Sequence, residues 1–116
     1  MSNQIKTAEL NDAMRAAISR PVPPNRVLMT AGVSHLGAGF GLAACAAVSQ
    51  YDFAKQDPGN DPYGEHDFGV FDIEGTKFYF KIDYYAKGSD HGFGSEDPAD
   101  ADKTERVLTI MLAEEY

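Results

Sequence analysis

The chain has 116 residues, of which 43% are apolar, enough for one packed domain and too many for a disordered chain. Its formal net charge is −8, and the charge is unevenly distributed. Residues 50–116 carry sixteen acidic and six basic side chains, whereas residues 1–49 carry two acidic and four basic ones. Such an acidic field disfavours direct binding to nucleic acid or an anionic membrane and attracts basic partners.

The first half of the chain predicts two helices and a short strand. A helix is expected over Thr7–Ile18, because apolar residues recur at three- and four-residue spacing: Ile5, Leu10, Met14, Ala17 and Ile18. Three prolines in Arg20–Asn25 end it. Arg26–Thr30 predicts a strand, and a glycine-punctuated turn follows. Phe40–Tyr51 then predicts a helix of small residues whose inward face is Leu42, Cys45, Ala46 and Val48.

A hairpin over about residues 66–85 is the clearest expected element. Two β-rich runs flank Glu74–Gly75, a plausible two-residue turn that pairs Ile73 with Thr76. The resulting register collects one apolar face, which is Phe71, Ile73, Phe78, Phe80, Ile82 and Tyr84. On the other face it pairs Asp72 with Lys77 and His66 with Asp83.

The C-terminal segment fits either a strand or a helix. A helix from about Ala101 is favoured, with Asp100 as its N-cap and a stripe formed by Thr104, Val107, Leu108, Met111 and Leu112. We therefore expect one α+β domain over residues 1–116. Its small antiparallel sheet, the hairpin at about 66–85 plus a strand at about 26–30, packs with two or three helices.

Four segments of the second half carry a resemblance to a known family. They are NDPYGEHDFG, KIDYY, GSEDPAD and RVLTIMLAEEY, in this order. Together they resemble domain of unknown function 3768, a family of small bacterial proteins often carried on plasmids and other mobile elements. The resemblance runs from Arg26 to the C-terminus, and Gly37–Ala47 departs from the family pattern. It implies no catalytic residue, but it implies a mobile-element protein encoded among genes that oppose host defence.

The loop at residues 57–67 offers oxygen ligands to a hard cation: Asp57, Asn60, Asp61, Glu65 and Asp67. The spacing of these residues does not match an EF-hand. Asp57 and Asp61 each precede a proline, and Gly59 and Gly64 permit tight bends. A solvated acidic loop closed by Asx-turns is therefore the favoured interpretation.

Other chemical signals are weak. His35, His66 and His91 have no paired spacing that would form a zinc site with Glu65 or Cys45. A pairing of His66 with Asp83 would supply part of a nucleophilic triad, but no G-x-S-x-G elbow is present. HLGAGFG follows a strand as a phosphate loop does, yet its glycines do not match G-x-G-x-x-G. No metal and no cofactor are expected.

Acidic residues are concentrated in a second segment, which contains Asp90, Glu96, Asp97, Asp100, Asp102 and Glu105. With the loop at 57–67 they are expected to form one negative face, edged by the aromatic residues Tyr63, Tyr79, Tyr85 and Phe93. Nucleic-acid-binding grooves are lined with Lys and Arg, so an array of carboxylates competes for them. The predicted partner-binding residues are Asp61, Tyr63, Glu65, Asp67, Glu96, Asp97 and Asp100.

These observations favour a binding protein over an enzyme. The expected function is inhibition of a host nucleic-acid-directed defence complex, as by an anti-CRISPR or anti-restriction protein that mimics DNA on a basic protein surface. One alternative is a small metal-dependent hydrolase centred on Glu65, His66, Asp83 and His91. Another is a structural or regulatory accessory protein of the mobile element, and a homodimer is an open possibility. No direct contact with nucleic acid or with a membrane is expected.

The sequence also favours a bacterial cytoplasmic location. Cys45 is the only cysteine, so it has no internal disulfide partner, and a lone thiol suits a reducing compartment. The N-terminal residues contain no apolar signal core, and the most apolar stretch, Gly37–Val48, is too short to span a bilayer.

Overall fold

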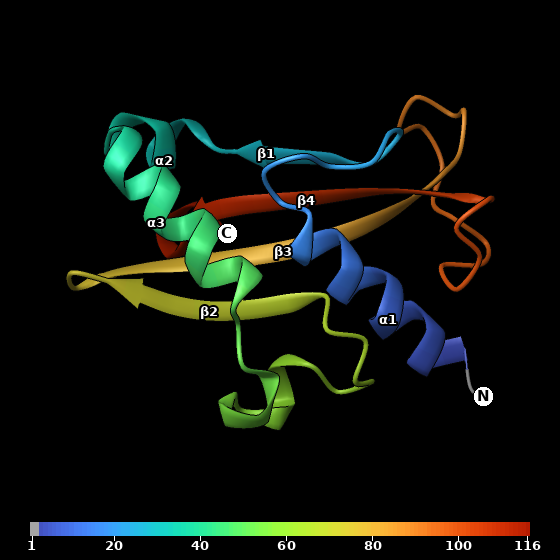
Figure 1. The fold of residues 1–116 in the computed structure, drawn as a ribbon, viewed down its shortest axis with the longest axis horizontal. Coiled ribbons are helices and arrows are strands. Elements are labelled where there is room, and N and C mark those ends of the chain that lie inside the picture. Colours follow the sequence, from blue (N-terminus) through green and yellow to red (C-terminus); the bar gives the residue numbers. More distant parts are fainter. Residues whose placement is uncertain (1–2) are drawn as a thin grey trace.

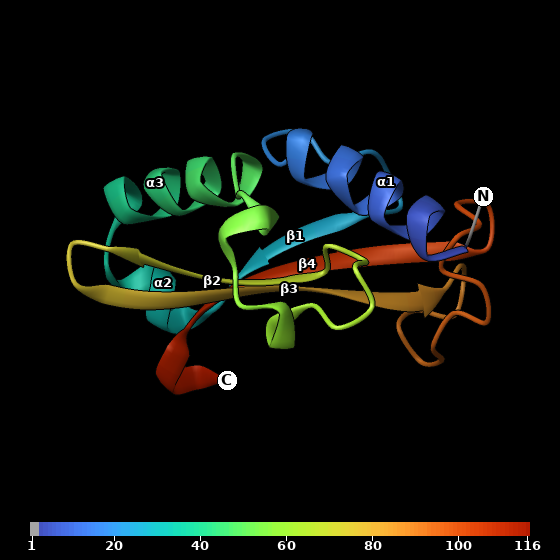
Figure 2. The same ribbon diagram turned by 90° about the horizontal axis from the view of Figure 1, so that it is seen from below.

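The computed structural model describes residues 3–116. Its centre is a four-stranded sheet with the strand order β1-β4-β3-β2. The strands are β1 (Arg26–Met29), β2 (Phe68–Ile73), β3 (Thr76–Ala86) and β4 (Thr104–Leu112). The helices are α1 (Asn3–Ala16), α2 (Ala31–His35) and α3 (Ala38–Ser49), with 3-10 turns η1 (Phe53–Lys55), η2 (Pro58–Asn60) and η3 (Ala113–Glu115). The predicted α+β class is confirmed, and Figures 1 and 2 show α1 and α3 together on one face of the sheet.

β4 occupies an inner position of the sheet, so the helix expected from Ala101 is wrong. It pairs in parallel with β1 and antiparallel with β3, which makes the sheet mixed rather than wholly antiparallel. Seven of its nine residues are buried. A strand that is buried on both faces shows no polar alternation, so its apolar run also fits a helical stripe. Asp100 and Asp102, expected at a helix start, lie in the loop before β4.

The predicted hairpin turn is confirmed. Ile73 pairs with Thr76, and Asp72 pairs with Lys77, on either side of Glu74–Gly75. Both turn residues have positive φ angles, 50° and 83°, as a two-residue turn of this kind requires. The sequence therefore specifies the β2–β3 register at this end of the hairpin.

The predicted pair of His66 with Asp83 is wrong. The ladder between β2 and β3 ends where Phe68 pairs with Lys81. The carboxylate of Asp61 accepts the backbone N–H of His66 (3.2 Å), and His66 has a φ of +62°. This local turn directs His66 away from the ladder, which the alternating pattern of the strand did not reveal.

α1 confirms the first predicted helix, but its buried face differs from the predicted stripe. Met14 and Ile18 are buried as expected, whereas Ile5 is 51% exposed. Asn11 and Arg15 are buried instead. Both side chains have hydrogen-bond partners inside the protein, so a pattern that counts only apolar residues misplaces this face.

α3 confirms the second predicted helix, again with a different buried face. Leu42 is 74% exposed and Ala46 is exposed, although both were expected inside. Val48 is buried as expected, Ala44 is buried with it, and Cys45 is half-buried. Because almost every residue of this helix is apolar, its sequence does not select one face.

The C-terminus is fastened to the segment after β1, where α2 replaces the expected turn. Glu115 accepts hydrogen bonds from the Thr30 hydroxyl (2.6 Å) and from the N–H groups of Gly32 (3.1 Å) and Leu112 (2.8 Å). These bonds, that of Thr30 first, lower the pKa of the Glu115 carboxyl. The contact holds η3 against the start of α2.

The hydrophobic core lies between the sheet and the two long helices. The predicted apolar face of the hairpin is confirmed, since Phe78, Phe80 and Ile82 are buried and the other members pack against them. The further core residues are Met14, Ile18, Val33, Ala44, Val48, Leu108, Ile110 and Leu112. Within residues 3–116, no helix is both long enough and apolar enough to cross a bilayer.

Candidate functional site

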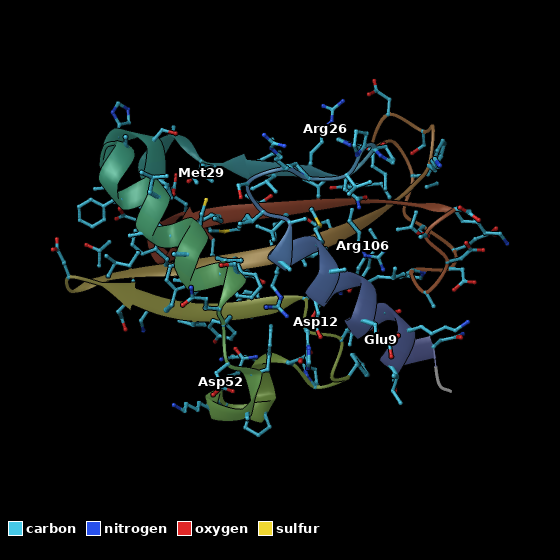
Figure 3. The ribbon with its side chains drawn as sticks, in the orientation of Figure 1. Glu9, Asp12, Arg26, Met29, Asp52 and Arg106 are labelled. Carbon is cyan, nitrogen blue, oxygen red and sulfur yellow. The ribbon has the colours of Figure 1, made fainter. Side chains whose placement is uncertain are left out.

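A buried polar network joins α1 to the sheet and to two loops. The amide nitrogen of Asn11 donates to the carbonyl of Glu65 (2.9 Å) and to the hydroxyl of Tyr84 (2.8 Å). Tyr84 donates to Glu65 Oε1 (3.1 Å). Arg106, which lies beneath α1 in Figure 3, donates from Nε to Asn11 Oδ1 (2.7 Å) and from a terminal nitrogen to the carbonyl of Pro98. Asn11 therefore links the loop that carries Glu65 to the loop that carries Pro98.

Partial exclusion of water changes the ionisation of this network. Burial lowers the pKa of Arg106, an effect that the nearby Tyr84 and Glu65 oppose. Burial, followed by the charge of Glu65, raises the pKa of Asp67 to about 6. Burial and then the charge of Asp67 raise the pKa of Tyr84, so its hydroxyl keeps the proton that it donates. The Tyr84 ring also lies 5.2 Å from the Arg106 guanidinium carbon.

The two loops that this network joins are strongly acidic. Residues 52–67 and 90–105 contain two lysines and eleven carboxylates, and we call these carboxylates the acidic end. They are Asp52, Asp57, Asp61, Glu65, Asp67, Asp90, Glu96, Asp97, Asp100, Asp102 and Glu105. The contacts of Asn11 and Arg106 join Glu65 of one loop and Pro98 of the other to the same junction beside α1, so the negative fields of the two loops reinforce one another there.

A cleft of about 860 Å³ opens between α1 and residues 50–66. Four carboxylates line it, from Asp12, Asp52, Asp57 and Asp61. Figure 3 shows Asp12 on α1 and Asp52 at the start of η1. Arg15, His66, the aromatic rings of Tyr51 and Phe53 and the amides of two glutamines also line it. The cleft has the size of a small-molecule site, but its lining is more acidic than is usual for such sites.

His66 stands in this cleft with a fixed orientation. Its Nδ1 lies 2.8 Å from Asp12 Oδ1, and its ring stacks on Phe53 with the centroids 4.2 Å apart. Asp12 also binds the guanidinium of Arg15, whose central carbon lies 4.7 Å from the centre of the Phe53 ring. A carboxylate that orients an imidazole beside a guanidinium is an arrangement that can support proton transfer.

Three of the predicted partner-binding residues shape turns. Asp61, Asp97 and Asp100 accept backbone N–H groups between two and five residues later, at 2.9 to 3.3 Å. Their oxygens therefore have internal partners, although their negative charges remain. Their loops are ordered by these bonds.

The other predicted partner-binding residues divide into two groups. Glu65 and Asp67 belong to the network beneath α1. Tyr63 is 69% exposed, and the side chain of Glu96 is 82% exposed with Lys103 at 3.8 Å. Asp57 and Asp102, which the sequence placed only in the wider acidic face, are also exposed. The accessible carboxylates therefore include Glu96 of the predicted set and also Asp57 and Asp102, which lay outside it.

The predicted hydrolase centre is not assembled. Its four residues are Glu65, His66, Asp83 and His91. Glu65 accepts a hydrogen bond from Tyr84, and His66 pairs with Asp12. Asp83 pairs with Lys81, and His91 pairs with Glu105. His91 also stacks on Tyr85, with the centroids 4.8 Å apart. The hairpin register on which that centre depended ends before His66 is reached.

The loop at 57–67 is closed by its own hydrogen bonds. Asp57 Oδ1 accepts the N–H of Gly59 (2.9 Å), which confirms the Asx-turn interpretation. No group of three or more His, Cys, Asp or Glu side chains in residues 3–116 is arranged to hold a metal ion. Burial raises the pKa of the Cys45 thiol, which disfavours the thiolate that zinc binds.

A family model described as "Protein of unknown function (DUF3768)" matches residues 29–115. The chain belongs to this family. The match confirms the resemblance carried by the four sequence segments. No curated protein and no solved structure matches the chain. In the DUF3768 match the acidic end is included, whereas Asn11, Asp12 and Arg15 of α1 lie before it. The network and the cleft thus combine residues inside and outside the family match.

Sequence patterns missed the residues of α1 that organise this region. Asn11 and Arg15 are polar residues on an expected surface helix, and nothing in their spacing indicates burial. Tyr84 was placed on the apolar face of the hairpin, which is correct, but its hydroxyl role was not foreseen. One sequence signal was available. Asn11 and Arg15 lie three residues before and one residue after Met14, so they share its side of the helix, and Met14 was expected to be buried.

Proposed function

We propose that this chain is a small acidic binding protein whose acidic end occupies a basic groove of a nucleic-acid-binding complex. In this role it is an inhibitor of a host defence complex, of the anti-CRISPR or anti-restriction kind. The observation that carries the proposal is the junction at Asn11 and Arg106, which binds one carbonyl from each carboxylate-rich loop, those of Glu65 and Pro98. The two loops lie more than twenty residues apart in the chain.

The balance of charge at the acidic end supports this function. The two loops contain eleven carboxylates and only two lysines, Lys55 and Lys103. The two nearby arginines, Arg15 and Arg106, are buried and engaged by internal partners, so they screen the surface weakly. Grooves that bind nucleic acid present Lys and Arg at phosphate positions, and a fixed array of carboxylates meets the same side chains.

The exposed members of the acidic end are the residues we expect to contact the partner. Asp57, Glu96 and Asp102 are exposed. Tyr63 lies among the acidic residues with 69% of its surface exposed, and exposed tyrosines are frequent interface anchors. Glu65 and Asp67 act indirectly, since they add charge and help to hold their loop.

Capture of partners from a bacterial lysate at low and at high salt tests this function. We expect a nucleic-acid-binding complex that is released by salt, because salt screens contacts between exposed charges. The double variant E96K/D102K should lose the partner. The matched control E74K/E114K makes the same change in total charge at exposed positions outside the acidic end and should keep it. Capture of the same complex by E96K/D102K would contradict the proposal.

The pairing of Asp12 with His66 favours a second candidate, general-base hydrolysis in the cleft. His66 would take a proton from water at Nε2 while Asp12 holds Nδ1. This differs from the centre predicted from the sequence, because Asp12 replaces Asp83 as the partner of His66. The test is turnover of a panel of ester and amide substrates. This candidate predicts activity that H66A removes and E96K/D102K keeps, and it fails if wild type turns over none of them.

A further inference from the structure

α1 and α3 cover one face of the sheet. Figure 2 shows that the other face carries no long helix, with α2 at one end of the sheet and the loop through η2 beside it. Successive strand residues point to opposite faces, so the positions that alternate with Phe78, Phe80 and Ile82 of β3 and with their β4 partners form this second face, which we call the open face. Val107 and Met111 of β4 are nevertheless buried on it. Its inner strands contribute Lys77, Tyr79, Lys81, Asp83, Tyr85, Glu105, Val107, Thr109 and Met111, and its edge strands contribute Arg26, Leu28, Phe68, Val70 and Asp72.

Two hollows adjoin one another on this open face. Their volumes are about 530 and 560 Å³, and both are lined by Lys81, Asp83 and Tyr116. Tyr116 is 73% exposed, and its ring lies 5.2 Å from that of Tyr79 and 5.7 Å from that of Phe68, centre to centre. Exposed aromatic side chains beside a hollow are characteristic of protein interfaces.

The strand positions of the open face are balanced in charge, whereas the hollows at its margin are also lined by Asp61, Asp67 and Glu115. These strand positions carry three basic residues, Arg26, Lys77 and Lys81, and three acidic residues, Asp72, Asp83 and Glu105. The whole chain carries ten basic and eighteen acidic residues. Two copies that approach through the acidic end repel one another, whereas two copies that approach through this balanced face do not.

The centre of the face is complementary to itself. Lys81 and Asp83 lie two positions apart on β3, with Lys81 Nζ 3.1 Å from Asp83 Oδ2. A two-fold axis that passes near Ile82 places Lys81 of one copy opposite Asp83 of the other, twice. A two-fold contact uses the same surface on both copies, so this alternation of opposite charges satisfies it.

We propose that two copies of this chain dimerise through the open face, sheet against sheet, about a two-fold axis near Ile82. The exposed surfaces of Leu28 and Tyr116 and the partly exposed ring of Tyr79 are then covered, and the pairs of Lys81 with Asp83 set the register. This inference does not depend on the function of the acidic end.

Sedimentation equilibrium from micromolar to millimolar concentration tests the dimer. Wild type should dimerise reversibly. K81D and D83K should each weaken the dimer at least about tenfold, because like charges then meet across the axis. An equimolar mixture of K81D and D83K should dimerise again, since both cross pairs are restored in the heterodimer. An ion pair within one chain cannot produce this restoration.

The controls are K55D and D102K, which make the same charge changes at exposed positions away from the open face and should leave the dimer unchanged. Thermal unfolding checks that each variant is folded. If a variant is not, Leu28→Asp replaces it, because Leu28 is 47% exposed on the same face and the charge should disrupt the contact. A monomer at every concentration, a dimer insensitive to these changes, or a mixture that fails to dimerise would each overturn the proposal.

Discussion

At the residue scale, Asn11 determines how the acidic region is built. It is a buried side chain of α1 that hydrogen-bonds the Glu65 carbonyl, the Tyr84 hydroxyl and Arg106, and it uses both its donor and its acceptor atoms. The buried guanidinium of Arg106 needs hydrogen-bond acceptors, and within residues 3–116 Asn11 Oδ1 is one of the two that it has, with the carbonyl of Pro98. A buried polar group that loses its partner costs more free energy than the bond itself contributes.

We expect Asn11→Ala to lower the free energy of unfolding by about 2 to 3 kcal/mol, because it leaves Arg106 Nε and the Glu65 carbonyl without this partner. Urea denaturation measures the effect. Gln4→Ala, on the exposed face of the same helix, is the control and should change stability little. Equal stability of the two variants would show that the network does not support the fold.

Asp67 should make the protein less stable as the pH rises. Its folded-state pKa of about 6 exceeds the ordinary value, so the unfolded chain releases this proton at lower pH than the folded chain. The contribution of Asp67 to stability is therefore lost between about pH 4 and pH 6 and does not return above that window. The burial of Asp67 and its proximity to Glu65 are the cause.

Asp67→Asn should remove this fall. We expect a gain of about 1 kcal/mol at neutral pH, smaller than the shift alone suggests because solvent screens a half-buried group. At about pH 4 the variant and wild type should be almost equally stable. Denaturant unfolding across this pH range is the measurement. If wild type and variant change in parallel with pH, the Asp67 carboxyl does not titrate as described.

At the element scale, the hairpin was predictable and β4 was not. The turn at Glu74–Gly75 and the alternating residues around it specify one register, because a shift by one residue would expose the whole apolar face. β4 is buried on both sides, so its sequence lacks the alternation that distinguishes a strand from a helix. Its strand conformation is determined by its pairing with β1 on one side and β3 on the other.

The buried polar residues of α1 could not be predicted from the sequence either. Asn11 and Arg15 are polar, and their burial depends on partners from residues that are distant in sequence, such as Arg106 and Val48. The acidic loops were recognisable from composition alone. Which carboxylates close turns, and which face outward, depends on hydrogen bonds that composition does not specify.

Gly69 is a packing position of β2. A Cβ atom there would lie 2.3 Å from Phe80 and 2.7 Å from Tyr51, both ring atoms. We expect Gly69→Ala to lower the free energy of unfolding by about 2 kcal/mol or more, since both rings must move. Thermal and urea unfolding measure this. In Gly39→Ala of α3 the new methyl meets nothing within 4 Å, so the same substitution should be neutral or stabilising there. Equal effects at the two positions would contradict the packing argument.

At the scale of the whole molecule, the acidic end and the open face are neighbouring surfaces. Glu105 belongs to both, and Asp61, Tyr63 and Asp67 line one hollow of the open face. The acidic end gathers where α1 crosses the loops before β2 and β4, and its field is negative. The strand positions of the open face are balanced in charge, and this face lies on the side of the sheet that α1 and α3 leave uncovered. A dimer formed through the open face would present two acidic ends to a partner, which would raise the apparent affinity if both reach basic grooves.

The central claim is that the acidic end and nucleic acid compete for one basic groove. The direct measurement is fluorescence anisotropy of labelled nucleic acid bound to the captured partner, while this protein is added. We predict that wild type and E74K/E114K displace the nucleic acid and that E96K/D102K does not. A ternary complex, in which the nucleic acid stays bound at saturating wild-type protein, would contradict it.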